Sequence, residues 1–337
     1  MLVLIGVVGV LMTAAAVATF SGPDGRIAFR RYLNSAQTAT AFFTMNPDGT
    51  DVRQIWRSPP HAVDDQPDWS PDGTKLAFTR VPQGPNWVGL INTDGTGLRH
   101  VTPRCTKAFT PNRVPAGCED AANVSFTPDG QHLTYTRATG KIRHFPKLQY
   151  DQIQHSAIAI IGLDGSGERE LYRVPVYAAD LNWPTMSPDG RLIMFERANS
   201  PLSKPRFGRA LFVMNVDGTN VHRVTPWKLG AGDNSDWAPD SSRILTRSFE
   251  DVDDEHSQYY TVRPDGTGLT QLTHFPYRKG RRLFSPSFSP EGTQIVFGRS
   301  RPNGAREIWE MNADRSNQHR VLASGKQDSA VDWGSAP

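Results

Sequence analysis

The fold of this chain is decided by the stretch Gln66-Pro67-Asp68-Trp69-Ser70-Pro71-Asp72-Gly73-Thr74-Lys75-Leu76-Ala77-Phe78-Thr79-Arg80. It reads as a strand, a tight turn and a second strand. In the turn, proline presets φ, aspartate is tolerated next, and glycine supplies the positive φ that closes a hairpin. After the turn, Leu76, Phe78 and Arg80 alternate, so their side chains share one face of a strand. The stretch predicts a β-hairpin with a buried aromatic face.

The same hairpin returns along most of the chain. Its turns begin at Pro23, Pro71, Pro128, Pro188, Pro239 and Pro290. A second hairpin and a polar strand follow each copy, with turns at Asp48, Asp94, Asp164, Asp217, Asp265 and Asp314. The third residues of the first turns are 48, 57, 60, 51 and 51 residues apart. Four-strand repeats of about 40–50 residues are typical of β-propellers. We therefore predict an all-β, six-bladed β-propeller of four-stranded blades.

The two ends of the chain complement each other. The first repeat has no strand before its turn, whereas residues 328–333 match residues 64–69, which precede the second turn. We expect the C-terminal strand to be the innermost strand of the first blade. This arrangement closes the ring and hides the strand edges that an open ring would expose.

The recurring Trp-Ser-Pro-Asp-Gly…Leu-Ala-Phe and Met-Asn-x-Asp-Gly-Thr segments resemble the TolB-type, WD-like bacterial propeller repeat. The resemblance covers about residues 23–333 and implies one propeller domain over residues 21–337. The family's namesake has an additional N-terminal α/β domain and works with an envelope lipoprotein. Because the family is diverse, the resemblance implies a fold more specifically than a function.

Residues 2–20 are uncharged and mostly apolar. Ala16-Val17-Ala18 is a small-residue cleavage site typical of a signal peptide, but the apolar length also approaches the roughly 20 residues of a membrane anchor. Both interpretations of residues 1–20 place the propeller outside the cytoplasm, in the periplasm, on the cell surface or secreted. Membrane association is expected only through residues 2–20, if they are retained.

The only two cysteines are Cys105 and Cys118, in the connection between the second and third repeats. A local cysteine pair in an exported protein usually forms a disulfide, and closing so short a loop stabilises a fold by about 3 kcal/mol. Two thiols without neighbouring histidine or cysteine ligands do not complete a zinc shell.

Charge and motifs argue against several function classes. The chain has 37 basic and 34 acidic residues, a balance that gives no reason to expect nucleic-acid binding. Gly-x-Ser-x-Gly and His-Glu-x-x-His motifs are absent from the sequence. We expect no catalytic residues, resident metal or cofactor, and a monomer. Similar propellers include pectin-degrading lyases, so a carbohydrate-active lyase or hydrolase is the alternative.

The residue before each inner-strand aromatic is small and polar: Asp68, Ser125, Thr185, Asp236, Ser287 and Asp332. We expect the three carboxylates, Asp68, Asp236 and Asp332, to line the central channel. They are interpreted either as solvated strand residues or as ligands of a water column or a calcium ion.

An arginine lies two residues after the aromatic of each second strand at Arg31, Arg80, Arg137, Arg197 and Arg299, and Arg247 joins this column if its turn has lost one residue. Such guanidinium groups are suited to tie neighbouring blades through carboxylates or carbonyls. A ligand-binding ring is the alternative interpretation.

The longest connection inside a repeat, residues 138–155, is basic and aromatic through Lys141, Arg143, His144, Phe145 and Lys147. Residues 278–282 form a second basic cluster. Each is either a solvated loop or a contact for a protein or an anionic glycan. We therefore expect a non-enzymatic binding or scaffold protein of the cell envelope, which recognises its partner through propeller loops.

Overall fold

The computed structural model describes residues 21–82, 84–108, 113–145, 150–200, 208–248, 256–277 and 279–337. The predicted signal peptide or anchor, Lys147 and Arg278 lie outside these ranges. Within the same ranges, no helix is both long and apolar enough to cross a membrane.

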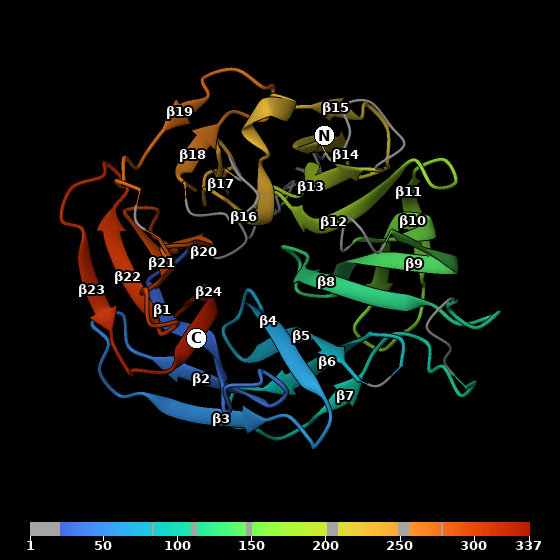
Figure 1. The fold of residues 1–337 in the computed structure, drawn as a ribbon, viewed down its shortest axis with the longest axis horizontal. Coiled ribbons are helices and arrows are strands. Elements are labelled where there is room, and N and C mark those ends of the chain that lie inside the picture. Colours follow the sequence, from blue (N-terminus) through green and yellow to red (C-terminus); the bar gives the residue numbers. More distant parts are fainter. Residues whose placement is uncertain are drawn as a thin grey trace, which may run out of the picture.

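Antiparallel sheets are arranged in a ring around a central axis (Figure 1). Four of them have four strands each. Their strands are β4 (Val63–Trp69), β5 (Lys75–Val81), β6 (Trp87–Asn92) and β7 (Arg99–His100); β8 (Asp120–Phe126), β9 (His132–Phe145), β10 (Tyr150–Gly162) and β11 (Arg169–Arg173); β12 (Ala179–Met186), β13 (Leu192–Asn199), β14 (Arg209–Asn215) and β15 (His222–Arg223); and β16 (Gly232–Trp237), β17 (Ile244–Arg247), β18 (Tyr259–Val262) and β19 (Thr270–Gln271). A short 3-10 helix, η2 (Trp227–Leu229), precedes β16.

The remaining eight strands form one sheet. One half, the β20–β23 group, contains β20 (Leu283–Phe288), β21 (Gln294–Ser300), β22 (Arg306–Asn312) and β23 (His319–Leu322). The other half, the β24–β3 group, contains β24 (Gln327–Ser335), β1 (Asp24–Tyr32), β2 (Thr40–Met45) and β3 (Arg53–Arg57). A single parallel residue pair, Arg306 with Gln327, joins the halves. This contact explains why two predicted blades are continuous with each other.

The predicted closure of the ring is confirmed. β24 pairs with β1 in antiparallel register, from Asp24 opposite Ser335 to Tyr32 opposite Gln327. Trp333 of β24 is 1% exposed. The C-terminal strand is therefore the innermost strand beside β1, close to the ring axis in Figure 1.

The turn between β4 and β5 shows why the repeated sequence forms a hairpin. Gly73 has φ of 65°, and its N–H donates to the Ser70 carbonyl at 2.9 Å. The Asp72 carboxylate accepts hydrogen bonds from the Ser70 hydroxyl at 2.6 Å and the Thr74 N–H at 3.0 Å. Glycine thus supplies the left-handed conformation, and aspartate satisfies the backbone of the turn.

The core is divided into clusters between neighbouring sheets. On β5, Leu76 and Phe78 pack with Phe42 and Trp69, whereas Ala77 belongs to the cluster shared with β8 and β9. Both faces of the strand are buried because each sheet lies between two neighbours. This packing leaves the loops at the ends of the strands and the central channel as the surfaces available for recognition.

Candidate functional site

The ring has two faces of different construction. Turns between the first and second, and the third and fourth, strands of each unit lie on one face, which we call the turn face. At ten of its turns an aspartate side chain accepts a hydrogen bond from the backbone N–H two residues later: Asp48, Asp72, Asp94, Asp129, Asp164, Asp189, Asp217, Asp240, Asp265 and Asp314.

The opposite side, which we call the loop face, carries the second-to-third-strand connections and the connections between units. These differ strongly in length. The β9–β10 hairpin extends the pairing as far as Phe145 opposite Tyr150. The β7–β8 connection contacts this hairpin, because the Val114 N–H donates to the Gly140 carbonyl at 3.0 Å.

The central channel is narrow, with a volume of about 60 Å³. Every innermost strand contributes to its wall, including all six of the polar residues expected there: Asp68, Ser125, Thr185, Asp236, Ser287 and Asp332. Two residues before each of them lies a non-glycine residue with positive φ: Gln66, Asn123, Trp183, Asn234, Ser285 and Ala330. All six innermost strands show a register shift at this point. Bulges of this kind reorient side chains, here toward the axis.

The channel carboxylates join neighbouring units through backbone hydrogen bonds. Asp332 accepts from the Trp69 N–H, Asp68 from the Phe126 N–H, and Asp236 from the Phe288 N–H, each at 2.7 Å. Ser287 continues this arrangement, since its hydroxyl accepts from the Trp333 N–H at 3.2 Å and donates to Asp332 at 3.3 Å.

Burial raises the pKa of all three carboxyl groups. It raises the pKa of Asp236 to about 7, with added repulsion from Asp332, and the pKa of Asp332 to about 6. The pKa of Asp68 is also well above its usual value, because of burial and then repulsion from Asp332.

Within the described residues, no group of three or more His, Cys, Asp or Glu side chains is placed to hold a metal ion. The observed hydrogen bonds give the channel carboxylates a structural role in holding the units together.

The arginine column divides into ties within units and ties between them. Arg31 pairs with Asp328 of β24 at 2.6 Å, inside its own group. Arg80 pairs with Asp64 at 2.5 Å, and Asp64 also accepts from the Trp56 indole of the neighbouring β3 at 2.7 Å.

The remaining arginines show the same division. Arg247 donates to the Leu283 carbonyl in the next unit. Arg197 donates to Asn199 at 3.2 Å, and Arg299 lies 4.6 Å from the Trp309 ring, both within their own units. Among the contacts between described residues, ties to a neighbouring unit are found directly for Arg247 and through Asp64 for Arg80.

Arg137 is at the centre of an acidic cluster near the loop face. It contacts Glu119 at 2.6 Å, Glu168 at 2.9 Å and Glu170 at 2.6 Å. The Tyr135 hydroxyl lies 3.2 Å from Glu119 and 3.0 Å from Glu168. Burial, followed by repulsion from Glu168, raises the pKa of Glu119 to about 7. Glu119 comes from the β7–β8 connection, whereas Glu168 directly precedes β11 and Glu170 lies in it, so spacing in the sequence did not reveal the cluster.

Glu119 also lines a loop-face cavity of about 570 Å³ between the β5–β6 and β7–β8 connections. Its wall includes Trp87 and His100, whose rings stack 4.1 Å apart. Burial, followed by repulsion from Arg104, lowers the pKa of His100 to about 4. The volume is within the usual range of about 300–1,000 Å³ for small-ligand sites.

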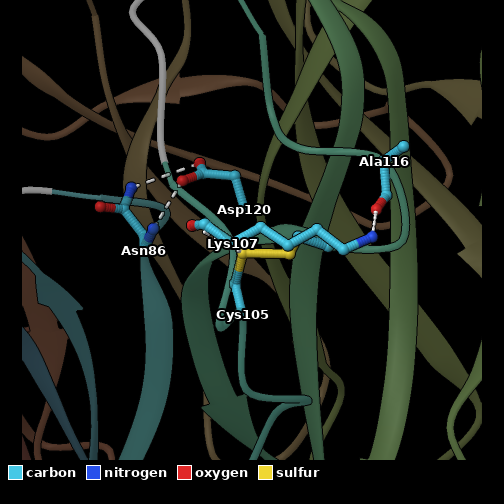
Figure 2. Close-up of a disulfide and its surroundings, with 6 residues drawn as sticks. Asn86, Cys105, Lys107, Ala116 and Asp120 are labelled. Atoms are coloured by element: carbon cyan, nitrogen blue, oxygen red, sulfur yellow. Dashed lines mark hydrogen bonds between the residues drawn. A yellow bond between two sulfur atoms is a disulfide. The ribbon is translucent and has the colours of Figure 1, made fainter.

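The predicted disulfide is confirmed and supports this cavity. Cys105, which lines it, is bonded to Cys118, with 5.2 Å between their Cα atoms. Figure 2 shows the bond beside the Lys107 side chain, which donates to the Ala116 carbonyl. In the same view Asn86 donates to Asp120 through its backbone N–H at 2.6 Å.

The basic insertion of the third repeat is a paired hairpin over its described part rather than a loose loop. Arg143 lies opposite Gln152 in the sheet, and its guanidinium lies 4.0 Å from the Tyr177 ring centre. Lys141 and His144 are exposed. Because the apolar alternation of β9 and β10 stops before these residues, the sequence did not indicate continued pairing.

Comparison with known proteins finds relatives with similar sequences and structures with a similar fold. No family model matches it. The Tol-Pal system protein TolB of Gluconobacter oxydans (strain 621H) is 44% identical over 61 residues, 17% of this chain and 14% of that protein. A protein TolB homolog of Chlorobium luteolum (strain DSM 273 / BCRC 81028 / 2530) is 33% identical over 114 residues, 34% of this chain and 22% of that protein. The crystal structure of TolB from Acinetobacter baumannii superposes with a TM-score of 0.67 at 17% identity, over 92% of this chain and 67% of that chain.

The chain resembles TolB proteins in the sequence of its repeats and in its β-propeller fold. The matched segments span less than a quarter of the curated TolB relatives, and the structural likeness concerns the fold. In this TolB-like propeller, the disulfide and the similarity to a Tol-Pal system protein both fit a location outside the cytoplasm.

Proposed function

We propose that this TolB-like propeller is a non-enzymatic binding protein of the cell envelope, which recognises a partner protein through its loop face. In this proposal the eight-stranded sheet acts as two blades, so that the ring has six. The domain lies in the periplasm or at the cell surface, with residues 1–20 as a signal peptide or an anchor.

The asymmetry between the two faces carries the proposal. The turn face repeats one short aspartate-capped turn, whereas the loop face combines an extended hairpin, a disulfide-closed connection and a cavity of about 570 Å³. Connections are where a rigid scaffold places its recognition residues. A ring held by buried aromatic clusters and channel hydrogen bonds keeps such connections in fixed positions, which lowers the entropic cost of binding.

Position-specific photo-cross-linking in cells tests the proposal. Benzoylphenylalanine replaces Thr106 on the loop face in one variant and Arg191 on the turn face in another; both positions are exposed. We expect a discrete cross-linked protein from position 106 and none from position 191. Equal products from both positions, or a product from position 191 alone, would contradict a loop-face partner.

A further inference from the structure

A cluster of arginines lies on the loop face at the mouth of the channel. Ser329 of β24 directly precedes Ala330, and Asp65 of β4 directly precedes Gln66; Ala330 and Gln66 both line the channel. Arg30 reaches this mouth from β1, and Arg306 reaches it from the first residue of β22.

The two guanidinium groups meet at one hydroxyl. Arg30 Nη2 donates to Ser329 Oγ at 2.8 Å, and Arg306 Nη1 donates to the same oxygen at 3.1 Å. Ser329 is 1% exposed. Since these two bonds use both acceptor positions of the hydroxyl, its proton is available to an incoming acceptor.

Positive charge at this point exceeds the negative charge available. Arg30 pairs with Asp65, but among the residues that the structure describes neither Arg306 nor the nearby, exposed Arg282 forms an ion pair. Arg30 and Arg306 therefore share the carboxylate of Asp65, and Arg282 is close enough to Arg306 to add to the positive charge. Burial, followed by repulsion from Arg30, lowers the pKa of Arg306. In addition, the buried Arg30 Nε has no hydrogen-bond acceptor. Buried charges of this kind are costly without a counter-ion.

Aromatic rings hold the guanidinium groups in place. Arg30 lies 4.3 Å from the Tyr32 ring centre, and Arg306 lies 4.4 Å from that of Phe284 and 5.6 Å from that of Tyr32. Planar guanidinium groups fixed in this way match carboxylate oxygens. The guanidinium groups cover the ring faces on which a sugar would stack, which argues against a glycan ligand. Arginine and tyrosine are typical of protein-binding hot spots, which favours a protein partner.

We propose that Arg30, Arg282, Arg306 and the Ser329 hydroxyl bind a carboxylate from an acidic segment of a protein partner. This inference rests on the proposed function and specifies the partner's chemistry. In this proposal the acidic segment lies over the channel mouth. Arg282 contacts the segment at the exposed edge of the site, and Arg306 contacts it at the buried end.

The test measures the binding of a fluorescent hexaglutamate peptide to the full chain at low salt, with hexaglutamine as the uncharged control. We expect hexaglutamate to bind and hexaglutamine not to bind. Loss of the charge-assisted bonds should weaken binding about tenfold or more in Arg306→Ala and about threefold in Arg282→Ala. Arg306→Lys keeps the charge but loses the two-pronged geometry, so we expect about a threefold loss. Arg191→Ala, the same charge change on the turn face, should stay within about twofold.

Several outcomes overturn the site. The site is contradicted if the wild-type protein binds both peptides equally, or if Arg282→Ala and Arg306→Lys both retain wild-type affinity. These two variants decide the question if Arg306→Ala does not fold. Binding of an oligogalacturonate, lost in the same variants, without binding of hexaglutamate assigns the site to a glycan instead. A loop-face cross-link at position 106 without hexaglutamate binding removes this site and leaves the proposed function in place.

Discussion

On the turn face, aspartate side chains fold each connection back on itself, and ten turns use the same hydrogen bond. On the loop face, the side chains of connections and strand ends contact neighbouring elements instead, through the Arg80–Asp64 pair, the Glu119–Arg137 pair and the disulfide. The difference indicates that repetition builds the ring, and we propose that departures from the repeat build the surface that recognises a partner. Four changes, from the largest expected effect to the smallest, test this comparison.

Removal of β24, by ending the chain at residue 325, should have the largest effect and should disrupt both faces. The strand supplies Asp328 to Arg31, Asp332 to the Trp69 N–H, and the buried Trp333. We expect loss of the cooperative thermal transition seen by calorimetry, because the ring then has an open edge. A cooperative transition at the wild-type midpoint would show that β24 does not close the ring.

Arg80→Ala should destabilise the loop-face side of the ring more than any single exposed substitution on the turn face. It leaves Asp64, whose side chain is 0% exposed, without its cation. Breaking a buried pair in this way typically costs about 3–5 kcal/mol. Urea unfolding measures the change, and Arg191→Ala on the turn face, expected within about 0.5 kcal/mol of wild type, is the control. Equal stabilities of the two variants would remove this distinction between the faces.

Loss of the disulfide should affect the loop face locally. Cys105 and Cys118 are 13 residues apart, and the bridge is worth about 3 kcal/mol on the chain-entropy account. We expect Cys105→Ser with Cys118→Ser to lower the unfolding free energy by about that amount and to increase hydrogen exchange in residues 101–119. Thiol titration of the wild-type protein should give free thiols only after reduction; free thiols beforehand would contradict the bridge.

Asp332→Asn should have a smaller, pH-dependent effect in the channel between the faces. The folded-state pKa of Asp332 is about 6, above the usual 3.8, so the folded protein holds this proton more tightly than the unfolded chain does. Its contribution to stability is therefore complete below about pH 4 and is lost as the pH rises through about 6.

Asparagine can accept from the Trp69 N–H and donate to Ser287, so it imitates the protonated acid. We expect the variant to be more stable than wild type by about 1 kcal/mol at pH 8, with little difference at pH 4. Melting temperatures across this range provide the measurement. A variant that is less stable at pH 8 would show that the ionised carboxylate strengthens the ring.

The sequence predicted the parts of the molecule that depend on local pattern. Turn residues and period-2 alternation identified the hairpins, the match between residues 64–69 and 328–333 identified the closing strand, and the cysteine pair identified the disulfide. The channel position before each inner aromatic was also evident from the repeat.

Contacts between repeats were not predictable in the same way. The positive φ at Gln66 and Ala330 occurs in residues that carry no signal for it, since neither is glycine. Arg30 and Arg306 are far apart in sequence and meet only because β24 lies between β1 and β22. The partners of Arg137 likewise come from separate parts of the chain, Glu119 from the β7–β8 connection and Glu170 from β11.

The most direct test of loop-face recognition is to block each face separately and measure binding to the protein cross-linked at position 106. Ala36→Cys on the loop face and Arg191→Cys on the turn face introduce exposed thiols, and polyethylene glycol maleimide modifies them selectively because both native cysteines are in the disulfide. We predict that modification at position 36 weakens binding at least about tenfold, equivalent to about 1.4 kcal/mol, and that modification at position 191 changes it less than about twofold. Undiminished binding after modification at position 36, with loss after modification at position 191, would contradict the account.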